Sequence, residues 1–261
     1  MSADASYGVW PELQVEVDGP IRVVRLNRPD DLNATNHELH RALAELFPQL
    51  DADDGARVAV LTGNGRAFSA GGDFEYLDQL SRDPVLRGET LVHGRQIVTG
   101  MVRCRVPVVA AVNGPAVGLG CSLVALSDIV FMAESAHLAD PHVLLGLVAA
   151  DGGPITWPLL TSLQLAKEYA LTGDRISAQR AAEIGLANHV VPDDEVFDRA
   201  MACAQRIAKL PKQATEDTKR VLNMHLERAV LATLDYALTA EDRSFTSDEL
   251  RTNLDRLRKR S

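Results

Sequence analysis

The stretch AAVNGPAVGLGCSLVALSDIVF, Ala110–Phe131, decides the fold class. It joins two apolar runs, Val106–Val112 and Ile129–Ala133, through a glycine-rich turn and a predicted helix over Leu119–Leu126. Runs that are apolar throughout are typical of strands buried on both faces of a parallel sheet. A strand, a helix and a second strand in this order predict an α/β layered core with right-handed crossovers.

The sequence before this stretch continues the same alternation. Asp-Gly-Pro separates two short strands, and apolar residues recur at helical spacing after a capping Asn36. The predicted elements are a hairpin over Leu13–Val17 and Ile21–Leu26, a helix over Glu38–Leu50, a strand over Val58–Thr62, a long loop over Gly63–Gly88 and a helix over Thr90–Arg103.

The sequence after Ala178 is mainly helical. A short strand, Asn188–Val191, precedes four predicted helices over Glu195–Lys209, Gln213–Met224, Glu227–Ala240 and Ser247–Lys259. We therefore place a boundary near Pro192, between an α/β core over residues 1–192 and a helical region over residues 193–261. The apolar faces of these helices must be buried on the core or on another subunit.

Composition excludes several classes of protein. The chain has 261 residues, 46% hydrophobic and 24% charged, which suits one large globular domain. Its net charge of −9 argues against binding to nucleic acid or to an anionic membrane. The three cysteines form no CxxC motif, which argues against a zinc site or a disulfide framework. No signal peptide and no apolar run of membrane-spanning length is recognised, so we expect a cytoplasmic protein.

Two turns of small residues follow buried strands. They are AFSAGGD, Ala67–Asp73, and NGPAVGLGCS, Asn113–Ser122. Small residues let a ligand approach the backbone, and a helix N-terminus points free N–H groups at an anion. Two such turns on neighbouring strands predict an oxyanion hole, although either turn alone is more often structural. The second turn lacks the third glycine of a dinucleotide fingerprint, and no phosphate-loop motif is present.

These segments together resemble the crotonase (enoyl-CoA hydratase/isomerase) family, in order and spacing, from about residue 12 to residue 192. Leu26-Asn27-Arg28-Pro29, followed by Leu32-Asn33-Ala34, resembles the family's opening. AFSAGGD and Ala110–Phe131 resemble its two oxyanion segments, and LTGDRISAQRAAEIGLANHVV, Leu171–Val191, resembles its later signature.

The resemblance implies a spiral of ββα units with a C-terminal helical trimerisation subdomain, assembled as a homotrimer or a dimer of trimers. It implies a coenzyme A thioester as substrate, with no separate cofactor and no metal. The backbone N–H groups of Ala70 and Leu119 would stabilise an enolate. The residues implied to contact substrate are Leu32 and Ala34 near the adenine, and Ala70, Gly71, Gly72, Asp73 and Gly118 near the thioester.

The sequence departs from the family where its hydratases carry two glutamates. Ser122 stands at one position and His142 at the other. A serine hydroxyl is not a general base by itself, so the two-glutamate mechanism cannot operate unchanged. We interpret His142 with Asp151 as the replacement, because a histidine oriented by a carboxylate activates water near neutral pH. The alternative is a structural histidine and a helix-capping aspartate.

The pair leaves three functions open. It would hydrate or isomerise an enoyl-CoA, or, as in the 6-oxocamphor hydrolase branch that it also resembles, direct water at a β-diketone or a thioester. A non-catalytic acyl-CoA-binding trimer is the third. A metal site at His137, Asp140 and His142 is disfavoured, because the family uses none.

Three other groups of residues carry weaker interpretations. The basic C-terminal stretch Arg251–Ser261 is either a solvated helix end or a contact for coenzyme A phosphates of a neighbouring subunit. His37 and His40 are interpreted as a surface pair. Tyr76 is expected in the loop that, by resemblance, closes over the acyl chain.

Overall fold

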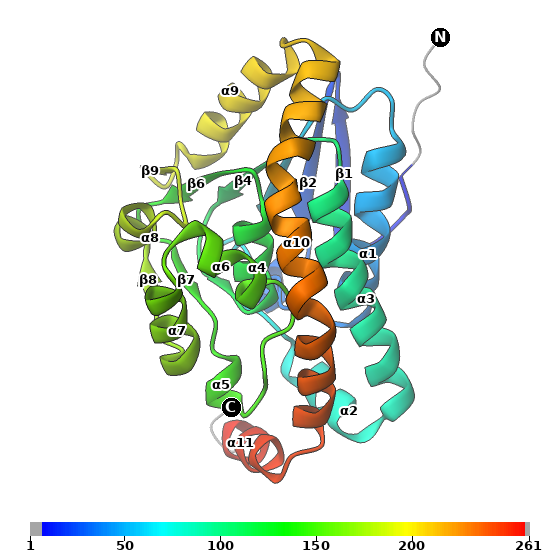
Figure 1. The fold of residues 1–261 in the computed structure, drawn as a ribbon, viewed down its shortest axis with the longest axis vertical. Helices are drawn as coiled ribbons and strands as arrows, with labels where there is room; N and C mark the ends of the chain where they lie inside the picture. Colours follow the sequence, from blue (N-terminus) through cyan, green and yellow to red (C-terminus); the bar gives the residue numbers. More distant parts are fainter. Residues whose placement is uncertain (1–6, 259–261) are drawn as a thin grey trace.

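A computed structural model describes residues 7–258, and its centre is a six-stranded sheet in the order β1-β2-β3-β4-β6-β9 (Figure 1). β1 pairs antiparallel with β2, and the other neighbours pair in parallel. The strands of this sheet are β1 (Leu13–Asp18), β2 (Ile21–Leu26), β3 (Val58–Gly63), β4 (Val108–Val112), β6 (Ile129–Ala133) and β9 (His189–Val191). A second sheet has the order β5-β7-β8, from β5 (Ala116–Val117), β7 (His137–Ala139) and β8 (Ile176–Ser177).

The predicted α/β core is confirmed, and its physical basis is burial. Every residue of β3 and β4 is buried, as expected for strands covered on both faces. The chain leaves β4, passes through β5 and the helix α4 (Leu119–Leu126), and returns to pair β6 in parallel with β4. The two glycine-rich turns therefore follow neighbouring strands, β3 and β4, at the same edge of the sheet.

Helices cover the sheet and surround the turns. α9 (Val196–Ala208) packs against β3, β4 and β6, while α10 (Lys212–Phe245) crosses the molecule and packs along α3 (Pro84–Arg103) and α6 (Gly153–Leu160) (Figure 1). The remaining helices are η1 (Pro29–Asp31), α1 (His37–Ala52), α2 (Phe74–Arg82), α5 (His142–Leu145), α7 (Leu163–Thr172), α8 (Ala178–Ile184) and α11 (Asp248–Arg258). None of the helices described is both long and apolar enough to cross a membrane.

Two element predictions are wrong. The expected loop over Gly63–Gly88 contains α2 and the first residues of α3, because Asp73 and Asp83 each accept two backbone N–H bonds and so cap these helices. The two helices expected over Gln213–Ala240 are one helix, α10, since no glycine or proline interrupts that stretch.

The C-terminal helices share the main hydrophobic core. Val196 and Ala200 of α9 and Leu234 of α10 belong to the same buried cluster as the strands. Lys219 of α10 forms a buried ion pair with Asp128 at 2.7 Å. Residues beyond Pro192 are therefore part of the core around the site, while their predicted role in oligomerisation stays a prediction.

Candidate active site

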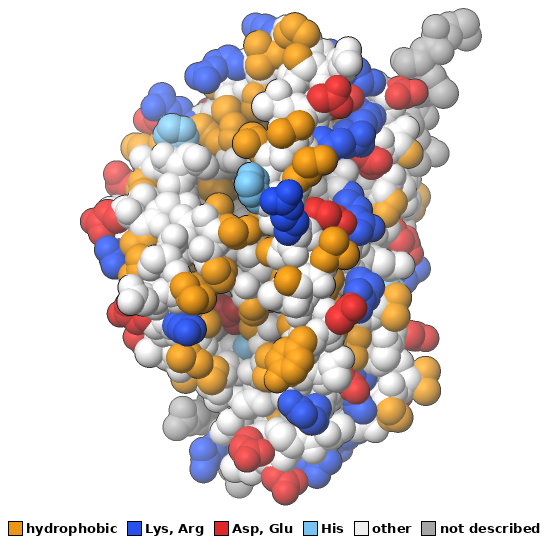
Figure 2. Space-filling model, in the orientation of Figure 1, with side chains coloured by type: hydrophobic (Ala, Val, Ile, Leu, Met, Phe, Trp, Pro, Cys, Tyr) orange, Lys and Arg blue, Asp and Glu red, His pale blue; other side chains and the backbone are white. Residues whose placement is uncertain are grey.

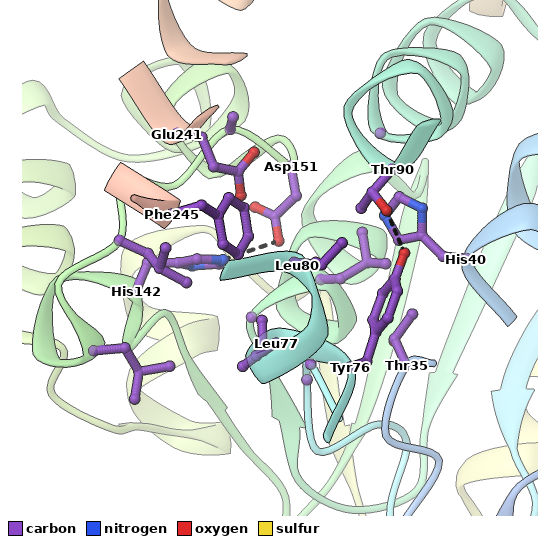
Figure 3. Close-up of a pocket in the computed structure, with 18 of the residues that line it drawn as sticks. Thr35, His40, Tyr76, Leu77, Leu80, Thr90, His142, Asp151, Glu241 and Phe245 are labelled. Carbon is purple, nitrogen blue, oxygen red and sulfur yellow. Dashed lines mark hydrogen bonds and ion pairs between the residues drawn. The ribbon is translucent and has the colours of Figure 1, made fainter. Parts of the chain in front are cut away.

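A cavity of about 140 Å³ lies where the two glycine turns, α5 and α10 meet (Figure 3). Cavities of roughly 150 Å³ hold a benzene molecule, so this one suits a small acyl group or ring. The predicted site residues that line it are Ala70, Gly71, Gly72, Gly118, Leu119, His142 and Asp151. The fold thus brings predicted residues from both turns, from α5 and from the loop after it to one cavity.

The two turns are held side by side by backbone contacts. The Val117 N–H donates to the Ser69 carbonyl at 2.9 Å, and Ser69 forms a bridge with Ala116. Gly71 has a φ of +89°, and a Cβ there would lie 3.0 Å from the Val117 carbonyl oxygen. A side chain at this position is therefore excluded by both backbone conformation and space.

The predicted Ala70 donor is wrong in this structure. The Ala70 N–H donates to the Leu32 carbonyl at 3.0 Å, so it is occupied within the fold. This bond ties the first turn to the segment after β2. A substrate oxygen would have to break it, which removes the advantage of a donor that is free and pre-set.

The free amide of this turn belongs to Gly72. Its neighbours are engaged, because Gly71 donates to Ser69 Oγ at 3.3 Å and Asp73 donates to the Thr35 carbonyl at 3.0 Å. Within residues 7–258 the Gly72 N–H has no partner, and Gly72 lines the cavity. The choice between adjacent amides depends on backbone torsions, which the sequence does not reveal.

The second donor lies at the start of α4. Leu119 is the first helical residue, so its N–H has no partner within the helix. Gly118 precedes it with φ +53° and ψ −122°, and donates its own N–H to the Ala139 carbonyl at 2.9 Å. The Leu119 amide, the predicted donor, therefore lies at the positive end of the helix and lines the cavity.

His142 is oriented by Asp140 rather than by Asp151. Its Nδ1 forms a short hydrogen bond with Asp140 Oδ1, and Asp140 is buried. Its Nε2 lies 3.7 Å from Asp151 Oδ2, too far for a direct hydrogen bond. The expected pairing of His142 with Asp151 is therefore an ion-pair contact, and the carboxylate that is hydrogen-bonded to the imidazole is that of Asp140.

Asp151 is held by the residue at the expected glutamate position. Ser122 Oγ donates to Asp151 Oδ1 at 2.8 Å, and both residues are buried. The serine therefore positions a carboxylate that comes from another part of the chain. The sequence spacing of 29 residues gave no signal for this contact.

Asp140 and Asp151 keep the imidazole of His142 protonated. Burial alone would lower the pKa of His142, but the charges of Asp140 and Asp151 and the bond to Asp140 raise it to about 10. Burial opposes ionisation of Asp140, yet His142 lowers the pKa of that carboxyl below its ordinary value. Burial raises the pKa of Asp151, and the His142 charge only partly offsets this. Near neutral pH the pair Asp140–His142 is thus ionic.

Glu241 of α10 is a further acid that sequence reasoning missed. It lines the cavity beside Asp151 and Phe245 (Figure 3). Burial raises the pKa of Glu241 to about 8; the His142 charge opposes this rise, and those of Asp151 and Asp140 add to it. Glu241 is therefore protonated at neutral pH. It lies 90 residues beyond Asp151 in the sequence, in a stretch that predicts only a helix.

The carboxylate cluster also has the spacing of a cation site. Asp140, His142 and Asp151 each offer one ligand atom, and these atoms lie within 4.8 Å of one another. His137, the third residue of the disfavoured metal site, is not in this group. Asp140 is bonded to His142 Nδ1, and we interpret the group as a cluster of charged side chains around one imidazole.

Some predicted contacts lie outside the cavity. Leu32, Ala34 and Asp73 are absent from its lining, and Asp73 instead caps α2 and pairs with Arg28 at 3.2 Å. Near the C-terminus, Arg251 pairs with Asp248 and Arg258 with Asp78. Lys259 and Arg260, also predicted to reach phosphates, lie outside the described residues.

Known proteins of similar sequence and structure include enoyl-CoA hydratases. A mitochondrial enoyl-CoA hydratase from Pongo abelii is 34% identical over 207 residues, covering 79% of this chain and 70% of that protein. The crystal structure of an enoyl-CoA hydratase/isomerase from Mycobacterium paratuberculosis is 64% identical, with a TM-score of 0.94, covering 96% of this chain and 100% of that one.

A third similarity is to a different activity. A beta-diketone hydrolase from the cyanobacterium Anabaena sp., bound to (S)-3-oxocyclohexyl acetic acid, is 29% identical with a TM-score of 0.84. The match covers 91% of this chain and 95% of that chain. The family pattern described as enoyl-CoA hydratase/isomerase matches residues 16–260. The chain therefore belongs to the enoyl-CoA hydratase/isomerase family.

Proposed function

We propose that the protein is an enzyme that adds water to an enoyl-CoA thioester, or isomerises it, through an enolate. The observation that carries the proposal is the arrangement of the cavity. Two unpaired amides, of Gly72 and Leu119, face the same space as the His142–Asp151–Glu241 cluster. One side thus stabilises an oxyanion while the other exchanges protons.

The amides act on the thioester carbonyl. When a nucleophile adds to C3, the C2–C3 π electrons move toward the carbonyl oxygen, which becomes negative. The N–H groups of Gly72 and Leu119 then donate to this oxygen more strongly than to the neutral carbonyl. One such donor contributes about 3 kcal/mol to transition-state stabilisation.

The cluster supplies and removes protons. Asp151 accepts a proton from water while the oxygen of that water bonds to C3. Glu241, protonated at neutral pH, then gives its proton to C2 as the enolate collapses. The proton on Asp151 then returns to Glu241, and the net change is addition of one water. His142, held protonated by Asp140, keeps Asp151 ionised enough to act as the base.

The direct test uses purified protein and short enoyl-CoA thioesters, with products identified by mass spectrometry. We expect a water adduct with the thioester intact, or a shifted double bond. Asp151→Asn should lower kcat by about 10²–10⁴-fold, whereas Asp54→Asn, at a fully exposed aspartate, should not change it. Thioester binding without turnover would favour the non-catalytic alternative and contradict the proposal.

A second candidate is hydrolysis of a β-diketone. The similarity to a beta-diketone hydrolase favours it, together with a cluster that replaces the two glutamates by a histidine and carboxylates. Water activated by Asp151 would then attack a ring carbonyl, and the leaving carbon would take a proton from Glu241. Ring-opened acid from a cyclic 1,3-diketone, with no turnover of enoyl thioesters, would select this candidate.

We further propose a homotrimer or a dimer of trimers, working in the cytoplasm without a separate cofactor. Exposed apolar side chains on α10, including Val221, Leu222 and Leu231, support an interface between copies (Figure 2). Light scattering on the eluted protein distinguishes one, three and six copies.

A further inference from the structure

The cavity has a second polar side, away from the catalytic cluster. Tyr76 and Thr90 lie there with His40, and in Figure 3 Leu77 and Leu80 separate this group from His142 and Asp151. The mechanism proposed above uses none of these polar residues. A polar group on a wall that is otherwise apolar fixes the orientation of a ligand and selects among ligands.

The hydrogen-bond directions on this side are determined by Thr90. Its Oγ1 donates its one proton to the Leu86 carbonyl at 2.8 Å. In the short bond between Tyr76 Oη and Thr90 Oγ1, the tyrosine must therefore be the donor. Burial raises the pKa of Tyr76 to about 12, so the phenol stays protonated. Its Oη has no proton left for a ligand and presents an acceptor.

His40 offers an imidazole that the protein does not satisfy. Only 8% of the residue is exposed, contrary to the expected surface position, and its Nδ1 is buried without a partner. No hydrogen bond from the ring to another described residue is found. A buried polar group without a partner is costly and is satisfied in most proteins by a ligand or water.

The imidazole is neutral. Burial, together with the neighbouring His93 and His37, lowers the pKa of His40 to about 3. The ring centroid of His93 lies 6.0 Å from that of His40 and 5.7 Å from that of His37. A neutral imidazole carries one N–H donor and one acceptor, and no fixed partner sets its tautomer here.

An anionic group is disfavoured at this side. No lysine or arginine occurs among the described residues that line the cavity. The carboxylates nearest to Tyr76 in electrostatic effect, those of Glu38 and Glu89, add negative potential. A buried carboxylate would lie here without a compensating charge.

We propose that this side of the cavity selects a neutral hydroxyl group on the acyl part of the substrate. The hydroxyl donates to Tyr76 Oη and accepts from an Nε2–H of His40, so one group engages both residues. A ketone lacks the donor that Tyr76 needs, and a methyl group satisfies neither residue. The inference rests on the proposed function, because it names the substrate class for the same cavity.

The first test compares matched substrates with the wild-type enzyme. Hex-2-enoyl-CoA is compared with its 4- and 5-hydroxy derivatives and with the corresponding 4- and 5-oxo ketones. We expect kcat/KM for one hydroxy position to exceed that of the unsubstituted substrate and of the ketones by about tenfold, from one or two buried hydrogen bonds. If the enzyme hydrolyses cyclic 1,3-diketones instead, the same comparison uses rings with and without a hydroxyl.

Two variants test the direction of the bonds. Tyr76→Phe should abolish the preference for the hydroxyl substrate, so that kcat/KM becomes equal within about twofold for the hydroxylated and the unsubstituted substrate. Thr90→Val removes the acceptor of the tyrosine proton, so the freed O–H of Tyr76 can donate to the substrate. The ratio of kcat/KM for the ketone to kcat/KM for the hydroxyl substrate should therefore rise. Tyr236→Phe, an exposed tyrosine on α10, is the matched control and should change neither ratio.

The outcomes separate the two proposals. No turnover of either substrate class by the wild type contradicts the proposed function. Turnover with equal kcat/KM for hydroxylated and plain substrates overturns only the hydroxyl inference. A preference that survives Tyr76→Phe also overturns it, because the selecting group would then lie elsewhere.

Discussion

Ser122 Oγ donates a hydrogen bond of 2.8 Å to Asp151 Oδ1, across 29 residues of sequence. By resemblance, position 122 is where hydratases of the family carry a glutamate, and here it supports a carboxylate instead of supplying one. The carboxylate beside Ser122 therefore comes from Asp151, in the loop before α6. Ser122 and Asp151 can provide a general base only if they act together, because the serine hydroxyl is not a base by itself.

Removing that hydrogen bond should impair Asp151 without removing it. The bond lowers the pKa of Asp151, so Ser122→Ala should raise that pKa further and move the acid limb of the kcat profile to higher pH. At neutral pH we expect kcat to fall by about tenfold, the effect of roughly 1.4 kcal/mol. Ser127→Ala, at the C-terminal end of α4, is the control. An unshifted acid limb would show that Asp151 is not the base.

Glu241 should determine the alkaline limb of activity. Its pKa of about 8 means that it loses its proton as the pH rises through 8, and the proton donor to C2 is then lost. We expect wild-type kcat/KM to fall above about pH 8. Glu241→Gln should be slower by about 10²–10⁴-fold and should lack this limb. Glu134→Gln, at an exposed site, should keep the wild-type profile.

Gly118 should tolerate no side chain. Its φ of +53° with ψ of −122° is a conformation that L-residues avoid, whereas a Cβ would make only an ordinary contact with His142 Cε1, at 3.6 Å, so the cost comes from the backbone. Gly118→Ala should destabilise the protein by about 1–3 kcal/mol and lower kcat, because the Leu119 amide shifts with the backbone. Thermal unfolding and kinetics measure the two effects.

The matched control for that variant is Gly88→Ala. Gly88 lies in α3, where a Cβ would meet nothing within 4 Å. Alanine there should stabilise the protein by about 0.5–1 kcal/mol, because glycine weakens a helix interior. Equal effects of the two substitutions would contradict the strain argument at Gly118.

His40 should make the protein sensitive to acid. Its pKa is about 3 when folded and about 6.5 when unfolded, so between these values only the unfolded state binds the proton. The contribution of His40 to the free energy of unfolding is therefore fully present above pH 6.5. It is lost as the pH falls toward 3, by at most about 1.4 kcal/mol per pH unit.

The measurement is denaturant unfolding of wild type and His40→Leu between pH 7 and pH 4. The variant should lose less free energy of unfolding over this range than the wild type does. Carboxylates that titrate in both proteins cancel in the difference. Parallel pH dependences would show that His40 is not held neutral in the folded state.

The central strands and the two turns could be predicted because their signals are local. The runs that form β3 and β4 are apolar throughout, and the small residues after them mark where a backbone must be approached closely. The helix α2 was also readable, since Phe74, Leu77 and Leu80 recur at helical spacing after a capping Asp73. The polar residues between them favour a loop, which is why the prediction over Gly63–Gly88 is wrong.

The partners within the site could not be predicted in the same way. Asp140 lies only two residues from His142, yet its role depends on a χ angle rather than on spacing. Glu241 reaches the cavity because α10 crosses the whole molecule. His40 is buried because α3 packs along α1. Each of these depends on packing between distant segments.

Because α10 is one continuous helix, the direction in which Glu241 points depends on how Lys219 is held. Lys219 is held by Asp128 and by the Val106 carbonyl, at 2.7 and 2.8 Å, and Glu241 lies roughly 33 Å further along the same helix at 1.5 Å per residue. With 3.6 residues per turn, the two side chains point within about 40° of the same direction. The contacts of Lys219 therefore fix the rotation of the helix about its axis, and with it the direction of Glu241. One residue inserted between them would turn Glu241 by about 100°, away from the cavity, while each local segment kept its sequence.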